Sequence, residues 1–155
     1  MTTMEQRYQT ILVGVDGSSQ AEDAYKKAVE VARRNNGRVV VAYIVDQPMS
    51  SFMGYAPLNE SVLDHEKEMG STLLEELENY AKSVDFTNVE TVLAFGSAKQ
   101  MIGKELPEKF DANLIMVGQS GLNAAERFIT GSVANYVIRE ARCDVLIVSP
   151  KEEEK

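Results

Sequence analysis

The chain has 155 residues, a length that predicts one domain. Its 44% hydrophobic and 26% charged residues are typical of a globular protein rather than a disordered or membrane-embedded one. Sixteen basic and 24 acidic residues give a net charge of −8, which argues against binding along a nucleic-acid backbone or an anionic membrane. We expect a single domain over residues 1–150 and a solvated acidic tail over residues 151–155.

The composition also narrows the kinds of site that the chain can hold. The first nine residues lack the apolar core of a signal peptide, and no run is long enough to span a membrane, so we expect a cytoplasmic protein. The single cysteine, Cys143, has no disulfide partner and is expected in the core. The single histidine, His65, excludes a histidine-rich metal site and is expected to be solvated.

The first apolar run, residues 10–15, predicts a strand, and the segment after it has apolar residues at helical spacing. Ser19 and Glu22 form a capping-box pattern at the start of this helix, and the asparagines before Gly37 favour a left-handed residue at its end. A second strand is expected over residues 39–45. The helix should bury a narrow stripe made of Ala21, Ala24, Ala28, Val31 and Ala32.

A long ordered loop is expected over residues 46–58, because prolines and glycines there alternate with apolar side chains. The apolar residues between Met49 and Tyr55 could cover a ligand, pack on a partner or form a local cluster, and the sequence leaves these alternatives open. A third strand is expected over residues 89–95. Between the loop and this strand lies a long helix whose apolar side consists of Val62, Met69, Leu73, Leu77, Tyr80 and Val84.

A shorter helix follows the third strand, with Ser97 and Gln100 in another capping-box pattern. Gly103 and Pro107 should weaken this helix, so we expect an early stop or a kink near Leu106.

The last part of the chain repeats the alternation, with strands over residues 112–117 and 144–149 and a helix over residues 132–142 between them. The strands are continuous apolar runs, which is typical of a parallel sheet covered on both faces. The sequence therefore predicts a three-layer, doubly wound α/β domain of the Rossmann-like type, with five strands.

Ligands of such folds bind at the carboxyl ends of the strands, where the strand order reverses. Two loops have the composition for this, one over residues 15–18 and one over residues 118–121 that continues to Gly131 and Ser132. Glycines let the main chain approach phosphate oxygens, and a helix N-terminus offers N–H groups, to which Ser132 adds a hydroxyl and Val133 an amide. Three glycines also close turns, so their number alone leaves both interpretations open.

The spacing of these residues is more specific than their number. Gly118, Gly121, Gly131 and Ser132 have the pattern glycine, two residues, glycine, nine residues, glycine, serine. In this the chain resembles the ATP-binding branch of the universal stress protein family. The resemblance covers nearly the whole chain, in the segments ILVGVDGS (11–18), AYIVD (42–46), LIMVGQSG (114–121), TGSVANYVI (130–138) and VLIVSP (145–150).

The resemblance implies a strand order of 3-2-1-4-5 and a nucleotide at the switch point. Val15 and Asp16 would lie beside the adenosine, and the main chain at Ile44 would contact the adenine edge. Val117 and Gly118 would border the ribose. An aspartate in this position also caps turns, so Asp16 has a purely structural alternative.

The resemblance also implies a phosphate site formed by Gly121, Gly131, Ser132 and Val133. A divalent ion such as Mg²⁺ would bridge phosphate oxygens without ligands from protein side chains. Arg127 either touches a phosphate or is solvated. Ser132 can cap the helix in addition to binding phosphate.

Catalytic machinery is not visible in the sequence. The Walker, dinucleotide and nucleophile-elbow patterns are missing, so we expect at most slow hydrolysis of ATP. The leading interpretation is a nucleotide-responsive regulator of the stress response. The alternatives are a dimeric scaffold whose nucleotide site is unused and a weak ATP hydrolase.

The last strand predicts a dimer. It lies at an edge of the expected sheet, and an apolar edge without a proline or a charge pairs with another strand. A second copy across a two-fold axis is the simplest partner, and the resemblance implies the same homodimer. The alternative is coverage by the N-terminal segment of the same chain. The residues that would form the dimer are Val145, Leu146, Ile147 and Val148.

Overall fold

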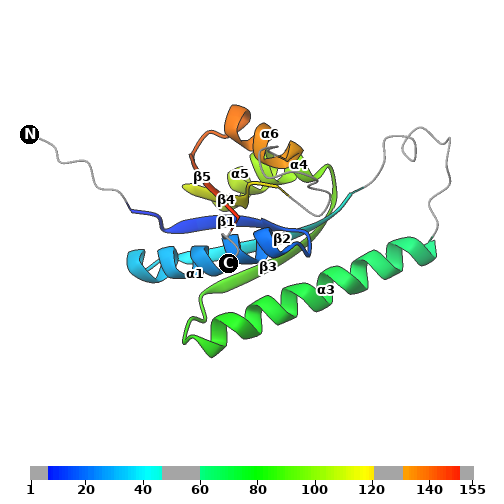
Figure 1. Cartoon of the computed structure of the whole chain (residues 1–155), viewed down its shortest axis with the longest axis horizontal. Coiled ribbons are helices and arrows are strands. Elements are labelled where there is room, and N and C mark those ends of the chain that lie inside the picture. Colours follow the sequence, from blue (N-terminus) through cyan, green and yellow to red (C-terminus); the bar gives the residue numbers. More distant parts are fainter. Residues whose placement is uncertain (1–6, 47–59, 121–130, 151–155) are drawn as a thin grey trace, which may run out of the picture.

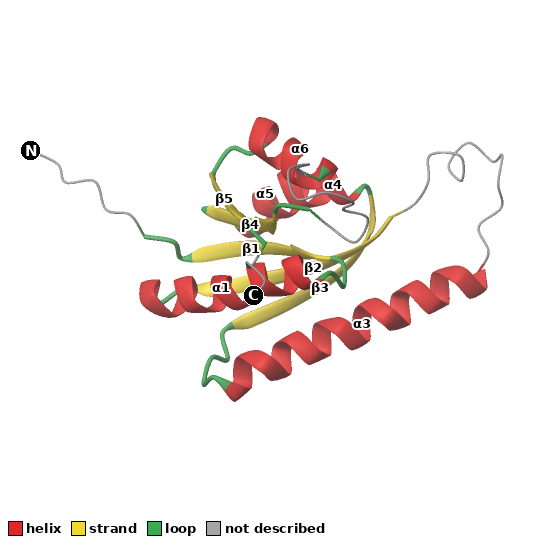
Figure 2. Cartoon of the chain, in the orientation of Figure 1, coloured by secondary structure: helices red, strands yellow, loops and turns green. Residues whose placement is uncertain are grey.

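Strands and helices alternate along the chain in the computed structural model, which describes residues 7–46, 60–120 and 131–150. The strands are shown as arrows in Figure 1 and in yellow in Figure 2. The elements are β1 (Thr10–Val15), α1 (Ser19–Asn35), β2 (Arg38–Asp46), α3 (Glu60–Ser83), β3 (Val89–Gly96), α4 (Ala98–Gln100), a π-helical turn (Met101–Glu105), α5 (Leu106–Phe110), β4 (Leu114–Gly118), α6 (Ser132–Glu140) and β5 (Asp144–Val148).

The five strands form one parallel sheet in the order β3-β2-β1-β4-β5. This confirms the predicted doubly wound α/β fold and its strand order. The order reverses between β1 and β4, where Ile11 pairs with Leu114 and Val13 with Met116. The carboxyl ends of these two strands therefore lie side by side, which is the place where such folds bind ligands.

Helices cover both faces of the sheet, with α1 and α3 on one side and α4, α5 and α6 on the other (Figure 1). Successive residues of a strand point to opposite faces, so Ile11 and Val13 pack under α1 while Leu12 packs under the other helices. All three are fully buried. This two-sided burial explains why the strand sequences are continuous apolar runs.

Helix α1 begins one residue earlier than its capping-box pattern predicted. Its N-cap is Ser18, whose Oγ accepts the N–H of Ala21 at 3.2 Å, and its left-handed C-cap is Asn36. The buried face is also wider than the predicted stripe, because it includes Tyr25 and Val29. A helix that lies over the centre of a sheet contacts several strands, which broadens its buried face.

Helix α3 buries much of the predicted apolar side but not its first part. Leu77 is buried and Leu73, Tyr80 and Val84 pack against the core, as predicted. Val62 is 57% exposed and Met69 is 50% exposed, so these two residues were predicted wrongly. The helix also approaches the sheet at Gly70, where a Cβ atom would lie 2.5 Å from Cδ1 of Tyr43. A glycine carries no weight in an apolar pattern, so the pattern did not indicate this contact.

The helical segment after β3 does not stop at Leu106 but widens before it. The N–H of Leu106 donates to the carbonyl of Met101, five residues earlier, and the helix continues to Phe110. Pro107 has no N–H and its ring clashes with the carbonyl four residues before it, so a π-helical turn accommodates it.

The predicted side-chain cap of this segment is absent, since the Ser97 side chain makes no capping hydrogen bond. Asp46 takes this role, because its Oδ1 accepts the N–H of Ala98 at 3.2 Å.

Cys143 and His65 have the expected environments: the first packs against the core and the second is exposed on α3. Burial raises the pKa of the Cys143 thiol, and the neighbouring Asp144 adds to this.

The buried Tyr25 should make stability fall in alkaline solution. Its hydroxyl donates to the Leu77 carbonyl at 2.7 Å, and burial, followed by the charge of Glu78, raises its pKa well above the usual value. A folded-state pKa above the unfolded value of about 10 gives stability that is complete below that pH and is lost as the pH rises. We expect the free energy of unfolding in urea to fall above about pH 10, and Tyr25→Phe to weaken this fall. Equal pH dependence of the two proteins would contradict this.

Candidate functional site

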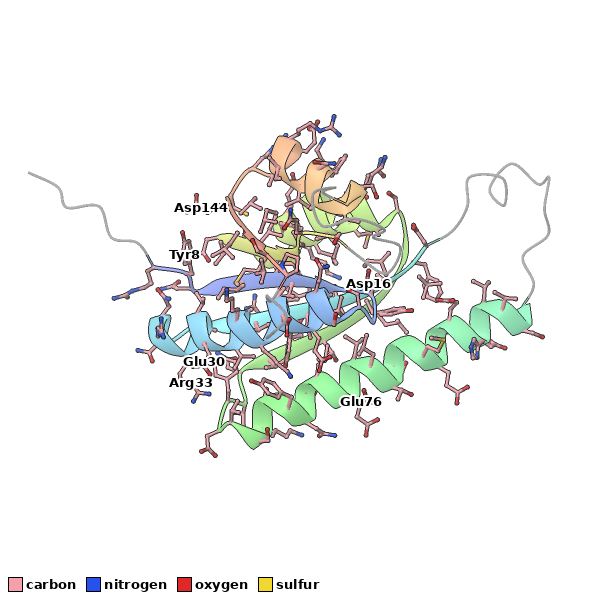
Figure 3. The ribbon with its side chains drawn as sticks, viewed as in Figure 1. Tyr8, Asp16, Glu30, Arg33, Glu76 and Asp144 are labelled. Carbon is pink, nitrogen blue, oxygen red and sulfur yellow. The ribbon has the colours of Figure 1, made fainter. Side chains whose placement is uncertain are left out.

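The candidate site lies at the carboxyl edge of the sheet, where β1 and β4 end. Figure 3 shows Asp16 at this edge, at the opposite end of the sheet from Tyr8 and Asp144. Val15 is the last residue of β1 and is buried, and Asp16 follows it in an exposed turn.

Asp16 has a structural role in this turn. Its Oδ1 accepts the N–H of Ser18 at 2.9 Å, and Gly17 between them has a φ of +90°, which favours glycine. The carboxylate thus fixes the path of the chain into α1. Only this one bond of Asp16 is seen among the described residues, and the group is exposed to solvent beside the end of β1.

Ile44 lies beyond the end of β1. The last pair between β1 and β2 is Val15 with Tyr43, while β2 continues to Asp46 along β3. Ile44 is therefore the first residue of β2 without a partner in β1, although it still pairs with Ala94 of β3. The main chain of Ile44 consequently borders the space where β1 ends.

Gly118 closes β4 and packs against α1. It pairs with Val148 of β5, and the preceding Val117 is buried. A Cβ atom on Gly118 would lie 3.1 Å from the backbone carbonyl carbon of Gln20, closer than most side-chain contacts. The glycine therefore permits the close packing of α1 on β4, whatever else it contacts.

A small set of hydrogen bonds joins the end of β4 to its neighbours. Gln119 donates its N–H to Val148 at 3.0 Å and accepts the N–H of Gly131 at 2.8 Å through its carbonyl. Ser120 donates its N–H and its hydroxyl to Oε1 of Gln20, at 3.0 and 2.9 Å. Residues from α1, β4, β5 and the start of α6 thus meet at one place.

The N-terminus of α6 lies at this place. Gly131 is the N-cap in an extended conformation, and the first helical bond runs from the N–H of Asn135 to its carbonyl. Ser132 is exposed and Val133 is half-buried, and the N-cap, Gly131, has no side chain with which to cap the helix. The N–H groups of a first helical turn have no partner inside the helix and carry a partial positive charge, so they suit an anion.

Some predicted features fall outside the described residues. Gly121 and Arg127 are among them, as are the apolar loop from Met49 to Tyr55 and the acidic tail over residues 151–155.

Carboxylates dominate the side chains around the site. The Tyr43 hydroxyl donates to Oε2 of Glu66 at 3.2 Å, and burial raises the Tyr43 pKa, with further contributions from Glu66 and Asp16. Asp46, at the end of β2, is a further exposed acid on this edge. In the described part of the chain, no group of three or more histidine, cysteine, aspartate or glutamate residues is placed to hold a metal ion.

The sequence as a whole matches a known family over almost its full length. The family model described as the universal stress protein family covers residues 7–149. The chain belongs to this family. A relative from Staphylococcus saprophyticus that carries the universal stress protein name is 42% identical over 145 residues, which are 94% of this chain and 86% of that protein.

Solved structures of universal stress proteins share the fold. The protein UspA from Lactobacillus plantarum has a TM-score of 0.79 at 26% identity, covering 93% of this chain and 99% of that one. A universal stress protein in complex with cAMP has a TM-score of 0.67 at 27% identity, covering 92% of this chain and 98% of that one.

The sequence analysis of this universal stress protein did not find Gln20, nor its contact with Ser120, which lies inside the predicted loop over residues 118–121. The two residues lie 100 positions apart, and neither belongs to a periodic pattern or to the spaced glycines. Only the packing of α1 beside β4 brings them together.

Among the described residues, no helix combines the length and the apolar character that crossing a membrane requires.

Proposed function

We propose that this universal stress protein binds ATP at the carboxyl edge between β1 and β4 and acts in the cytoplasm as a nucleotide-responsive regulator of the stress response. The observation that carries the proposal is the hydrogen bond of 2.8 Å between Gly131 and Gln119. It brings the N-terminus of α6, whose N-cap is a glycine, beside the end of β4. The similar protein in complex with cAMP supports an adenine nucleotide as the ligand.

In this proposal the adenosine lies where β1 ends. Val15 and Asp16 border it, and the main chain of Ile44 contacts the adenine edge because β1 no longer pairs with β2 there. Val117 and Gly118 border the ribose. The support for this placement is the register of the strands, which puts all five residues at one edge.

The phosphates are proposed to lie at the start of α6. Gly131, Ser132 and Val133 would offer N–H groups and a hydroxyl, as would Gly121 in the segment that precedes them. The carboxylates of Asp16, Asp46 and Glu66 repel a polyphosphate, which favours a divalent ion such as Mg²⁺ bound to the phosphates. When bound, the ion offsets charge on the phosphate oxygens; no protein side chain is assigned as its ligand.

The proposal includes a homodimer through β5. This strand is at the edge of the sheet, pairs with β4 on its inner side, and has Leu146 38% exposed. Among the described residues of the N-terminal segment, Tyr8 lies at the start of β5, where its hydroxyl donates to Oδ2 of Asp144 at 2.8 Å. In the proposal, the second copy pairs with the outer edge of Val145, Leu146, Ile147 and Val148.

Gly131→Val tests the proposed phosphate site. The backbone of Gly131 has φ −63° and ψ 159°, an extended conformation that valine adopts readily, so the variant should fold normally. The added side chain stands at the N-cap, where phosphate oxygens would approach. We expect the Kd for Mg·ATP, measured by isothermal titration, to rise at least about tenfold, which corresponds to about 1.4 kcal/mol.

The matched control is Ser97→Val. Ser97 is also an extended N-cap without a side-chain capping bond, but it follows β3 rather than β4. This variant should bind Mg·ATP like the wild type. Binding that survives unchanged in Gly131→Val would reject the phosphate site and favour the scaffold alternative.

A further inference from the structure

We propose that Gln20 is a positioning residue for the nucleotide site, in that it holds the turn after β4 through Ser120 and thereby sets the position of the α6 N-terminus. This inference rests on the proposed function. Gln20 lies on α1, outside the glycine motif, and acts on the site through the protein rather than by touching the nucleotide.

The contact between Gln20 and Ser120 is specific. Oε1 of Gln20 accepts two hydrogen bonds, one from the Ser120 N–H at 3.0 Å and one from its hydroxyl at 2.9 Å. A backbone N–H can only donate, so the accepting atom of the side-chain amide must be the oxygen. Ser120 is only 9% exposed, which means that water cannot easily replace this acceptor.

The position of Gln20 is fixed by the start of α1. It is the second residue of α1, two positions after the Ser18 cap, and its backbone lies 3.1 Å from the place that a Cβ on Gly118 would take. A shift of the helix along β4 would disturb this close packing and the cap. Oε1 of Gln20 therefore lies at a defined position beside the turn after β4.

Hydrogen bonds connect the turn after β4 to the start of α6. Gln119, the neighbour of Ser120, is bonded to Val148 on one side and to Gly131 on the other, at 3.0 and 2.8 Å. If Ser120 lost its acceptor, a buried N–H would be left unsatisfied, which costs about 1–3 kcal/mol unless the turn moves. A moved turn displaces the Gln119 carbonyl and with it Gly131, the N-cap of α6.

The test compares Gln20→Met with Gln20→Glu. Methionine has a similar length but no acceptor oxygen, whereas glutamate keeps an oxygen at the same reach. We expect Gln20→Met to raise the Kd for Mg·ATP about tenfold and to shift the Gly131 amide resonance of the nucleotide-free protein. Gln20→Glu should restore that resonance to its wild-type position, which a general loss of helix stability would not produce.

Two further variants complete the experiment. Gln100→Met, an exposed glutamine on α4, should leave both the affinity and the resonance unchanged. Ser120→Ala keeps the backbone bond to Gln20 and loses the hydroxyl bond, so a smaller rise of about threefold is expected. Thermal unfolding checks that each variant is folded at the temperature of the titration.

The outcomes separate this inference from the proposed function. If the wild type binds no nucleotide, the proposed function is wrong and this inference is wrong with it. If the wild type binds and Gln20→Met binds equally well, or if Gln20→Glu displaces the Gly131 resonance as far as Gln20→Met does, only the positioning role is wrong.

Discussion

Replacing Gly37 with alanine is expected to lower the free energy of unfolding by about 3 kcal/mol. Gly37 is buried between the end of α1 and the start of β1, where a Cβ atom would lie 2.5 Å from the carbonyl oxygen of Tyr8 and 2.8 Å from that of Gln9. Both are backbone atoms. They cannot rotate away as the tip of a side chain would, because Gln9 also accepts the N–H of Arg38 at 2.8 Å.

Asn36→Gly is the matched control for this substitution. Asn36 precedes Gly37 and has a φ of 52°, a left-handed conformation that glycine adopts without strain. Its stability in urea should stay close to that of the wild type. If Gly37→Ala and Asn36→Gly unfold at the same urea concentration as the wild type, the close approach of Gly37 to the backbone of Tyr8 and Gln9 is wrong.

Gly118→Val is expected to destabilise the fold by about 2 kcal/mol and also to weaken nucleotide binding. The added Cβ would lie 3.1 Å from backbone and side-chain atoms of Gln20 and 3.2 Å from its carbonyl oxygen. Helix α1 must move away from β4 to make room, and the contact between Gln20 and Ser120 moves with it. Urea unfolding and nucleotide titration of the same preparation measure the two effects.

The two glycines of the motif should therefore respond differently. Gly118→Val should lose stability and affinity together, whereas Gly131→Val should lose affinity alone. A Gly118→Val protein with wild-type stability and no nucleotide binding would show that Gly118 is required by the ligand and not by α1. For this reason Gly131 is the better position at which to test the phosphate site.

The fold was largely predictable because its signals are local and repeated. Buried strands such as β1 appear as apolar runs, and the amphipathic helices separate them. The strand order came from the family resemblance. The face of α3 was predicted correctly at Leu77 but wrongly at Val62 and Met69, which are exposed. The close approach of Gly70 to Tyr43 had no apolar signal and is visible only in the folded structure.

The main-chain residues of the candidate site could be predicted from the sequence, whereas the side-chain contacts that hold them in position could not. The spacing from Gly118 to Ser132 pointed to the end of β4 and the start of α6, and both lie at the edge where β1 ends. The contact between Gln20 and Ser120 has no signal in the sequence, because it depends on how α1 is placed over β4. The use of Asp46 in place of Ser97 as a cap likewise depends on the alignment of β2 and β3.

The proposed nucleotide site and the proposed dimer edge are joined by a direct contact. Gln119 donates its N–H to the carbonyl of Val148, the last residue of β5, and accepts the N–H of Gly131 at the start of α6. A nucleotide that orders the start of α6 would therefore act on the end of the strand that is proposed to form the dimer. In the proposed regulator, these hydrogen bonds would connect the nucleotide to the partner surface without any catalysis.

The most direct test of the central claim is a heteronuclear NMR titration of the nucleotide-free protein with Mg·ATP. We expect saturable shifts of the Val15, Ile44, Gly118 and Gly131 amides, which all lie at the carboxyl edge of the sheet. The amides of Thr10 and Gly37, at the opposite edge, should not move. Saturable shifts at that opposite edge, or no saturable shifts at all, would contradict an ATP site between β1 and β4.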